Sequence, residues 1–190
     1  MGMNIKLGAF VRGLIGVAII STVAFSSAGY GVEAVKGHYN GKKVSLETSY
    51  QNGNLEGPFR NYYESGKLKS EGVLKSGEPE GTVRWYYENG QLEKEGVFRN
   101  GKIEGVVQWY DENGLLTCEG FHRNGILDGL FKNYYKSGKL KNEGVYKNGE
   151  FEGLLTAYYE NGQLRIEGVY KNGEFGGMFR EYDANGQLKK

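Results

Sequence analysis

The chain has 190 residues, of which 32 are glycine, 15 are tyrosine and only two are proline. This composition favours strands and turns and argues against a helical bundle. The formal net charge of +1, from 24 basic and 23 acidic side chains, gives no electrostatic basis for binding nucleic acid and little for binding anionic lipid.

The first 28 residues differ from the rest of the chain. Lys6 and Arg12 give a positively charged start, an apolar run (LIGVAIISTVAF) spans residues 14–25, and small residues follow at 26–28. This is the layout of a secretory signal peptide, and the run is shorter than an ordinary membrane span. We expect cleavage after Ala28 and an exported protein, located in the periplasm, at the cell surface or outside the cell. An uncleaved N-terminal anchor is the alternative.

The remainder divides into a linker and a repeat domain. Residues 29–40 carry no repeated text and are expected to form the linker. The repeat domain spans residues 41–190 and begins with a degenerate half-repeat at 41–56, in which Thr48 stands where a glycine would be expected. Regular repeats start at residues 57, 81, 105, 129, 153 and 177.

Four series of glycines recur with a period of 24 residues and account for 23 of the 32 glycines. Each repeat also contains two turn signals. Asn-Gly or Ser-Gly stands at 76–77, 100–101, 124–125, 148–149 and 172–173, and Glu-Asn-Gly or a close relative at 64–66, 88–90, 112–114, 136–138, 160–162 and 184–186. Asn-Gly between β-type runs is a strong hairpin signal, because both residues tolerate positive φ. Two turns per repeat leave two strands, so we predict an all-β fold: an elongated antiparallel β-meander of about a dozen strands in a single-sheet repeat array.

Pairing across the Asn-Gly turns predicts which side chains share a face. Around Asn100-Gly101 it places Phe98 opposite Ile103 and Gly96 opposite Gly105. Continuing by twos reaches more apolar residues, so this face is expected to be buried. It includes the series Phe59, Val83, Val107, Phe131, Leu155 and Phe179, and the Leu series at 68, 92, 116, 140, 164 and 188. The opposite face is expected to be mixed, with Glu, Lys or Arg, and Val or Phe alternating along it.

A tyrosine ladder recurs at one position of every repeat: Tyr62, Tyr86, Tyr110, Tyr134, Tyr158 and Tyr182. Strict alternation places these side chains on the mixed face. A bulge just before them would instead return them to the buried face, opposite the Leu series. The sequence leaves both placements open.

The repeated text resembles MORN-type repeats, and specifically a bacterial, antitoxin-like variant of them. The resemblance is carried by GTVRWYYENGQL at 81–92 and GLLTAYYENGQL at 153–164, each followed by EGVYKNG or a similar run. It covers residues 53–190 and, through the half-repeat, residues 40–52. It implies a β-meander that contacts other molecules, usually proteins.

Little in the sequence points to catalysis. Cys118 is the only cysteine, which excludes an internal disulfide and a cysteine-built metal site. His122 lies four residues away in the same expected strand, about 13 Å at ~3.3 Å per residue, which is too far for a nucleophile–base hydrogen bond. The repeated glutamates are the same in every repeat, so none stands out as a catalytic carboxylate. We expect no enzyme activity, no catalytic residues, no metal and no cofactor.

We therefore expect an exported repeat scaffold that binds another protein. The alternatives are a module that binds an envelope glycan through the tyrosine ladder, whose members would be roughly 9–10 Å apart on every second strand, and an immunity or antitoxin-like protein that neutralises a toxin. The tyrosine ladder is the best candidate for a binding element, and the alternative is that its rings only pack against glycine and leucine. We expect no nucleic-acid partner and no strong membrane-lipid signal after cleavage.

Overall fold

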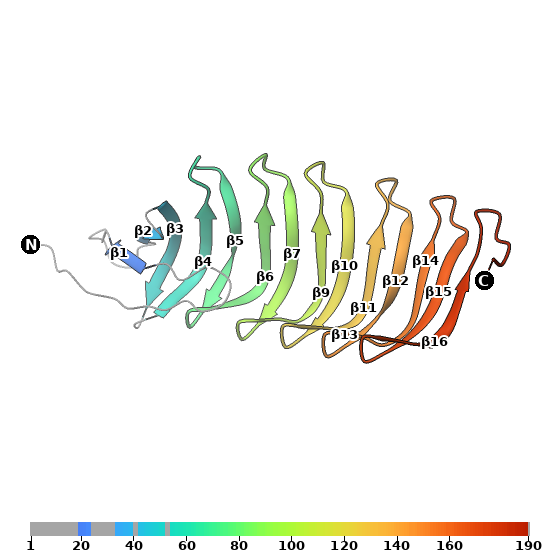
Figure 1. Ribbon diagram of the computed structural model, residues 1–190. Helices are drawn as coiled ribbons and strands as arrows, with labels where there is room; N and C mark the ends of the chain where they lie inside the picture. Colours follow the sequence, from blue (N-terminus) through green and yellow to red (C-terminus); the bar gives the residue numbers. More distant parts are fainter. Residues whose placement is uncertain (1–18, 24–32, 40–41, 52–53, 190) are drawn as a thin grey trace, which may run out of the picture. The chain divides into compact units, whose positions relative to one another are not determined.

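The computed structural model describes residues 19–23, 33–39, 42–51 and 54–189, and its side chains from residue 54 onward together with Thr48. All regular elements in these ranges are strands, which confirms the all-β prediction (Figure 1). None of these residues belongs to a helix long and apolar enough to cross a membrane.

The chain divides into two units, described separately: residues 1–91 with 98–102, and residues 92–97 with 103–190. The strands of the first unit are β1 (Ile19–Val23), β2 (Glu33–Tyr39), β3 (Lys42–Gln51), β4 (Asn54–Tyr62), β5 (Leu68–Lys75) and β6 (Glu78–Tyr86). Each pairs antiparallel with the next strand in sequence, as a meander requires.

The second unit continues the same pattern. Its strands are β7 (Leu92–Arg99) and β8 (Lys102–Ile103), each partly in the first unit, then β9 (Gly105–Tyr110), β10 (Leu116–Arg123), β11 (Ile126–Tyr134), β12 (Leu140–Lys147), β13 (Glu150–Phe151), β14 (Gly153–Tyr158), β15 (Leu164–Lys171) and β16 (Glu174–Glu181). In this unit β9, β10, β11, β12, β14, β15 and β16 lie side by side in that order, while the short β13 also pairs with β12 (Figure 1), and all these pairings are antiparallel.

The N-terminal predictions fall largely outside the described residues. Of the expected signal peptide, only Ile19–Val23 is described, as strand β1. The structure differs from the expected linker at residues 29–40, because Glu33–Tyr39 is a strand. This strand pairs with β3 along its whole length, from Glu33 with Thr48 to Tyr39 with Lys42.

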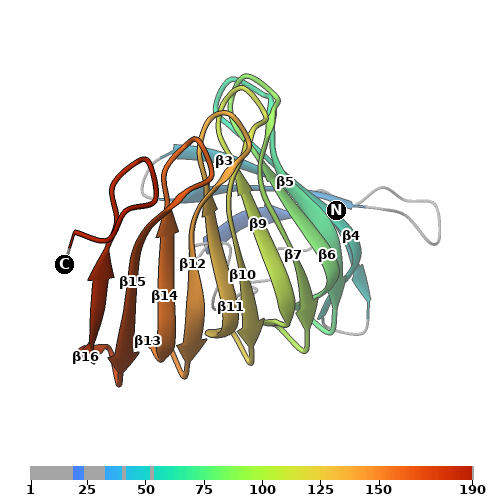
Figure 2. The ribbon, with the colours of Figure 1, turned by 90° about the vertical axis from the view of Figure 1, so that its right-hand side faces the viewer.

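The two turn signals produce two different turns. At Asn100-Gly101 both residues have positive φ (48° and 74°), as in the type I′ hairpin turn that the sequence predicts. In the Glu-Asn-Gly loops only the glycine is left-handed: Gly90 has a φ of 91°, and its N–H donates to the carbonyl of Tyr87 at 2.9 Å. This is a type I turn closed by a left-handed glycine. In Figure 2 the hairpin turns of β9–β16 form a row at one end of the strands and the longer loops a row at the other.

The strand register departs from the prediction at the glycine that opens each repeat. Gly120 pairs with Phe131, whereas His122 pairs with Leu127, so β11 contains two more residues than β10 over this stretch. The irregularity includes Gly129, whose φ is 154°. The predicted pairing of Gly96 with Gly105 is therefore wrong, because strict alternation does not anticipate the inserted residues. Gly120 instead has a large apolar residue on both sides, Val107 and Phe131.

A second irregularity occurs beside the tyrosine ladder. Asn133 pairs with Asn142 and Tyr134 with Leu140, so Lys141 is an extra residue on the strand that follows the tyrosine. The bulge lies on the partner strand, and the tyrosine keeps the alternation of its own strand. The Leu series, predicted to belong to the buried row, therefore lies across from the tyrosines, and none of its members is buried.

In each unit one face of the sheet, here called the core face, forms a hydrophobic core; it carries Phe59 and Val83 in the first unit and Val107 in the second. Phe98 and Val107 have no exposed surface, as predicted. In the first unit, a Cβ added to Gly72 would lie 2.8 Å from the ring of Phe59 and 2.9 Å from a methyl group of Val83. Neighbouring side chains thus occupy the space above each glycine, and one sheet can bury apolar groups without a second layer.

This packing makes the glycines unequal in their tolerance of a side chain. A Cβ at Gly120 would lie 2.7 Å from Leu127 Cδ1 and 2.9 Å from Phe131 Cδ2, whereas at Gly168 the nearest atom, the Met178 carbonyl oxygen, is 3.4 Å away. We expect Gly120→Ala to lower the free energy of unfolding by about 1–3 kcal/mol through overpacking. Gly168→Ala, the matched control, should have a much smaller effect. Urea denaturation followed by circular dichroism measures both, and equal losses would contradict this account of the core.

Candidate binding surface

The tyrosine ladder lies on the face opposite the core, here called the outer face. Tyr134 on β11 donates its hydroxyl proton to Glu119 Oε1 on β10, with an O···O distance of 2.7 Å. Glu119 pairs with Lys132, two residues from Tyr134 and on the same face. The sequence left two placements of the tyrosine ladder open. The structure shows the one on the mixed face. The other contacts of this kind are Tyr86–Glu71 at 2.8 Å, Tyr158–Glu143 at 3.3 Å and Tyr182–Glu167 at 2.8 Å.

The paired glutamates also contact basic residues. Glu167 accepts hydrogen bonds from Arg180 and Tyr182, and these lower the pKa of its carboxyl group. Burial raises the pKa of Tyr134 to about 12, and the hydrogen bond to Glu119 acts in the same direction. These four hydroxyls thus donate hydrogen bonds to glutamates of neighbouring strands in the same sheet. That arrangement favours a structural role for the ladder, and its predicted binding role stays a prediction.

Sequence reasoning missed a second set of tyrosines, which tie each repeat to the next. The hydroxyl of Tyr63 donates to the backbone oxygen of Tyr86 at 2.6 Å, across a separation of 23 residues. Tyr135 and Tyr159 make the same bond to Tyr158 and Tyr182 at 2.6 and 2.8 Å. The Tyr-Tyr doublet repeated in the sequence is the signal that could have revealed these bonds.

A set of glutamates one residue before the opening glycines was also missed. Their carboxylates accept hydrogen bonds from the first residue of the next Asn-Gly or Ser-Gly turn, 20 residues further along. The pairs are Glu56–Ser76, Glu80–Asn100, Glu104–Asn124 and Glu152–Asn172, at 2.7–3.0 Å. The repeated Glu-Gly dipeptide is the sequence signal for them.

An apolar row crosses the outer face of the second unit. One cross-strand pair comes from each of three repeats: Val106 with Phe121, Leu130 with Val145, and Leu154 with Val169. We call these six residues the outer stripe. Four of them are 42–48% exposed: Val106, Leu130, Val145 and Leu154. The adjacent core residue Val107 is fully buried, so at this repeat the exposed apolar side chain lies on the outer face.

Charged and polar side chains border the outer stripe on both sides. Toward the tyrosines lie Glu95, Gln108, Glu119, Lys132, Glu143, Thr156, Glu167 and Arg180. Toward the hairpin turns lie Glu104, Arg123, Asp128, Lys147, Glu152 and Lys171. Both borders contain both signs of charge, and several of these groups pair with one another, as Arg123 does with Asp128 at 3.9 Å.

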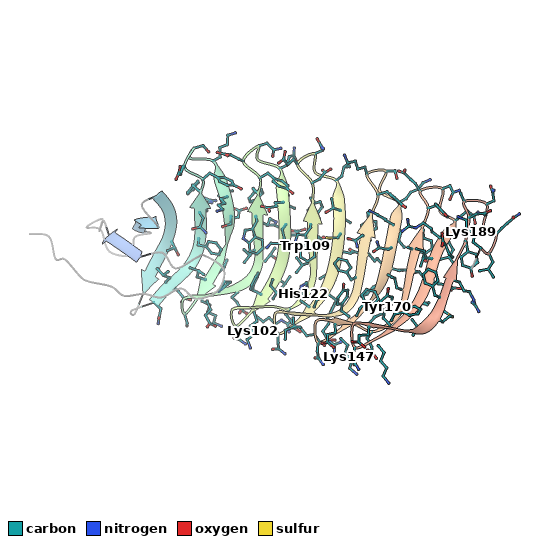
Figure 3. All side chains as sticks on the ribbon, in the orientation of Figure 1. Lys102, Trp109, His122, Lys147, Tyr170 and Lys189 are labelled. Carbon is teal, nitrogen blue, oxygen red and sulfur yellow. The ribbon has the colours of Figure 1, made fainter. Side chains whose placement is uncertain are left out.

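The cysteine and histidine of the third repeat both neighbour a tryptophan on the core face. Cys118 pairs with Trp109, and the rings of Trp109 and His122 lie 5.9 Å apart (Figure 3). Nδ1 of His122 is 3.0 Å from the carbonyl oxygen of Gly120, and because a carbonyl only accepts, this nitrogen carries the proton. Burial raises the pKa of the Cys118 thiol, which disfavours a reactive thiolate. Across the described residues, no three His, Cys, Asp or Glu side chains gather in a group that could hold a metal ion.

The hydrogen bond between Tyr134 and Glu119 predicts a late titration of the Tyr134 hydroxyl. The folded protein keeps Tyr134 protonated above its ordinary pKa of 10.0. The contribution of this group to stability is therefore complete below pH 10 and is lost as the pH rises to about 12. In a spectrophotometric titration of phenolate absorbance, Tyr134→Phe should remove one hydroxyl from the late part of the curve. Glu119→Gln should shift that hydroxyl to lower pH, because the negative charge is gone. An unchanged late step in Tyr134→Phe would show that another hydroxyl is responsible.

The repeat text matches a family model described as MORN repeat variant. The match comprises five tandem segments, residues 55–75, 79–100, 103–124, 127–148 and 151–172. Their starting residues are 24 apart, and together they cover more than half of the chain. A search of the curated proteins finds none that matches it. The resemblance seen in the sequence is confirmed at the level of the repeat, and the chain belongs to the MORN repeat variant family.

Proposed function

We propose that this chain is an exported, non-enzymatic scaffold that binds another protein through the outer stripe. The observation that carries the proposal is the exposure of Val106, Leu130, Val145 and Leu154 in a row that crosses neighbouring strands. Single exposed apolar residues are common on soluble proteins, but a contiguous row rimmed by polar groups is typical of interaction sites.

The chemistry of the stripe favours a protein partner over nucleic acid or lipid. Its borders mix acidic and basic side chains, such as Glu119 beside Lys132 and Glu167 beside Arg180. A nucleic acid or an anionic membrane would require a border of one positive sign. A protein surface with an apolar centre and both signs of charge around it matches this pattern, since complementary charges give specificity and register.

The repeat architecture supports the same proposal. Each repeat contributes one apolar pair at the same position, so affinity can be assembled from several modest contacts along the array. An immunity or antitoxin-like role would be a special case, in which the bound protein is a toxin. Identification of the partner distinguishes the two.

Photo-crosslinking in cells tests the proposed surface. A photoreactive amino acid at Leu130 should form one discrete adduct with a partner protein. The same residue at Leu115, which is 43% exposed in the turn between β9 and β10, should not. Val145→Lys should reduce the Leu130 adduct at least several-fold, because it places a charge beside the contact without disturbing the core. Equal adducts from both positions, or none from Leu130, would overturn the proposal.

Export has its own test. The basic start, the apolar run at 14–25 and the small residues before Gly29 support processing after Ala28. Mass spectrometry of the protein recovered from cell fractions should show a mature N-terminus at Gly29 in the periplasmic, surface or extracellular fraction. Full-length protein confined to the cytoplasm would contradict the export part of the proposal and leave the binding surface to be judged separately.

A further inference from the structure

Aromatic rings form a continuous chain of contacts on the core face of the second unit. Six residues from β11 to β16 take part, here called the aromatic strip: Phe131, Tyr146, Phe151, Tyr170, Phe175 and Phe179. Successive ring centroids lie 4.8–6.1 Å apart, with interplanar angles of 62–80°. This edge-to-face geometry is the favourable one for aromatic pairs. Tyr170 is labelled in Figure 3.

At some positions the strip carries aromatic rings where the first unit has smaller apolar residues. The positions of Tyr146 and Phe151 are taken in the first unit by Leu74 and Pro79, which pair with each other and are both buried. Tyr146 and Phe151 are only half-buried. Phe175 and Phe179 are 54% and 42% exposed. Phe98, which stands in the first unit at the repeat position of Tyr146, is fully buried, so the exposure of the strip does not follow from the size of the rings.

The glycines beneath the strip hold the rings against the sheet. A Cβ at Gly144 would overlap the ring of Phe151, so this ring lies directly over the backbone. A Cβ at Gly168 would be 3.6 Å from Phe175 and 3.8 Å from Phe179. The rings of Phe151, Phe175 and Phe179 therefore lie close over the backbone of these glycines.

The row beside the strip is uncharged from β11 to β15, and a charged pair closes it at β16. Beyond the glycines, the next row of the core face contains Asn133, Asn142, Ala157 and Ile166, and it ends at Glu181, which pairs with Ile166 and lies 3.7 Å from the ammonium group of Lys189. Asn133 donates to Asn142 Oδ1 at 2.7 Å, and Ala157 is buried. The outer face of the same strands is instead crowded with carboxylates, lysines and arginines. A ligand that lies along the strip from β11 to β15 therefore meets uncharged groups, and the carboxylate of Glu181 at β16 is already paired with Lys189. A neutral ligand suits this surface, with apolar C–H groups for the rings and hydroxyl groups for the amides and the tyrosine hydroxyls.

We propose that the aromatic strip binds an extended, uncharged polysaccharide. The C–H face of a hexose ring carries small positive partial charges that suit the negative π face of an aromatic ring. Equivalent rings such as Tyr146 and Tyr170 recur on every second strand, roughly 9–10 Å apart, so a polymer with repeating units can meet several of them. The site is distinct from the outer stripe, which lies on the opposite face, and does not depend on the function proposed for it.

Affinity electrophoresis tests the proposal with defined probes. Native gels would contain a soluble β-glucan, soluble starch or soluble chitin oligosaccharides, with anionic alginate as the charged comparison. The full chain should be retarded by at least one neutral polymer and not specifically by alginate. Tyr146→Leu combined with Tyr170→Leu should weaken the retardation about tenfold in apparent affinity, because leucine keeps the position apolar, as at residue 74, but removes two rings.

Controls separate this site from the protein-binding surface and from misfolding. Val145→Lys on the outer face should leave the retardation unchanged, and far-ultraviolet circular dichroism of the double variant should match that of the unaltered protein. If circular dichroism shows that the double variant is unfolded, Tyr170→Leu alone, expected to weaken the retardation to a smaller extent, takes its place. Absence of retardation by all the neutral polymers, or retardation that the Tyr→Leu changes do not alter, would overturn the proposal. So would sedimentation showing that the strip instead joins two copies of the chain.

Discussion

The fold depends on a glycine at the centre of one strand in each of five repeats, at residues 72, 96, 120, 144 and 168. The described strands form no second layer over the apolar face, so among these residues the cover comes from side chains of the same sheet. Gly72 leaves the space that Phe59 and Val83 fill, and Gly120 does the same for Leu127 and Phe131. Because these glycines have neighbours with large side chains on both adjacent strands, the core is an alternation of large residues and empty positions.

The second requirement is that consecutive repeats keep the same register, and three hydrogen bonds of fixed sequence separation provide this. The N–H of a hairpin glycine donates to a carbonyl 22 residues earlier, as Gly125 does to Ile103 at 2.9 Å. A carboxylate such as Glu104 accepts from the next turn, and a hydroxyl such as that of Tyr135 reaches the next tyrosine carbonyl. All three link one repeat to its neighbour. The 24-residue period is thus maintained at both ends of the strands, which makes a regular surface available for binding.

Much of this fold could be predicted from the sequence, because turns and periodicity are local properties. Asn100-Gly101 specifies a type I′ turn by its backbone preferences, and Phe98 and Val107 were correctly placed in the core. The bulges could not be predicted, since an inserted residue such as Lys141 leaves the spacing of glycines unchanged. For the same reason the Leu series was placed in the wrong row, and the face of Tyr134 stayed open. The valines of the outer face were visible in the sequence, but their exposure depends on what lies over them, which only the structure shows.

The two faces of the second unit differ in how they vary from repeat to repeat, and this difference separates their roles. The outer stripe presents an aliphatic or aromatic pair of similar size each time, such as Leu130 with Val145 and Leu154 with Val169. The core face changes from Val107 to Phe131 and from His122 to Tyr146 along the chain. Packing against glycine tolerates valine as well as phenylalanine, as Gly96 and Gly120 show, so stability alone does not require the aromatic residues. Contact with the polysaccharide proposed above would account for their accumulation on a face that is partly exposed.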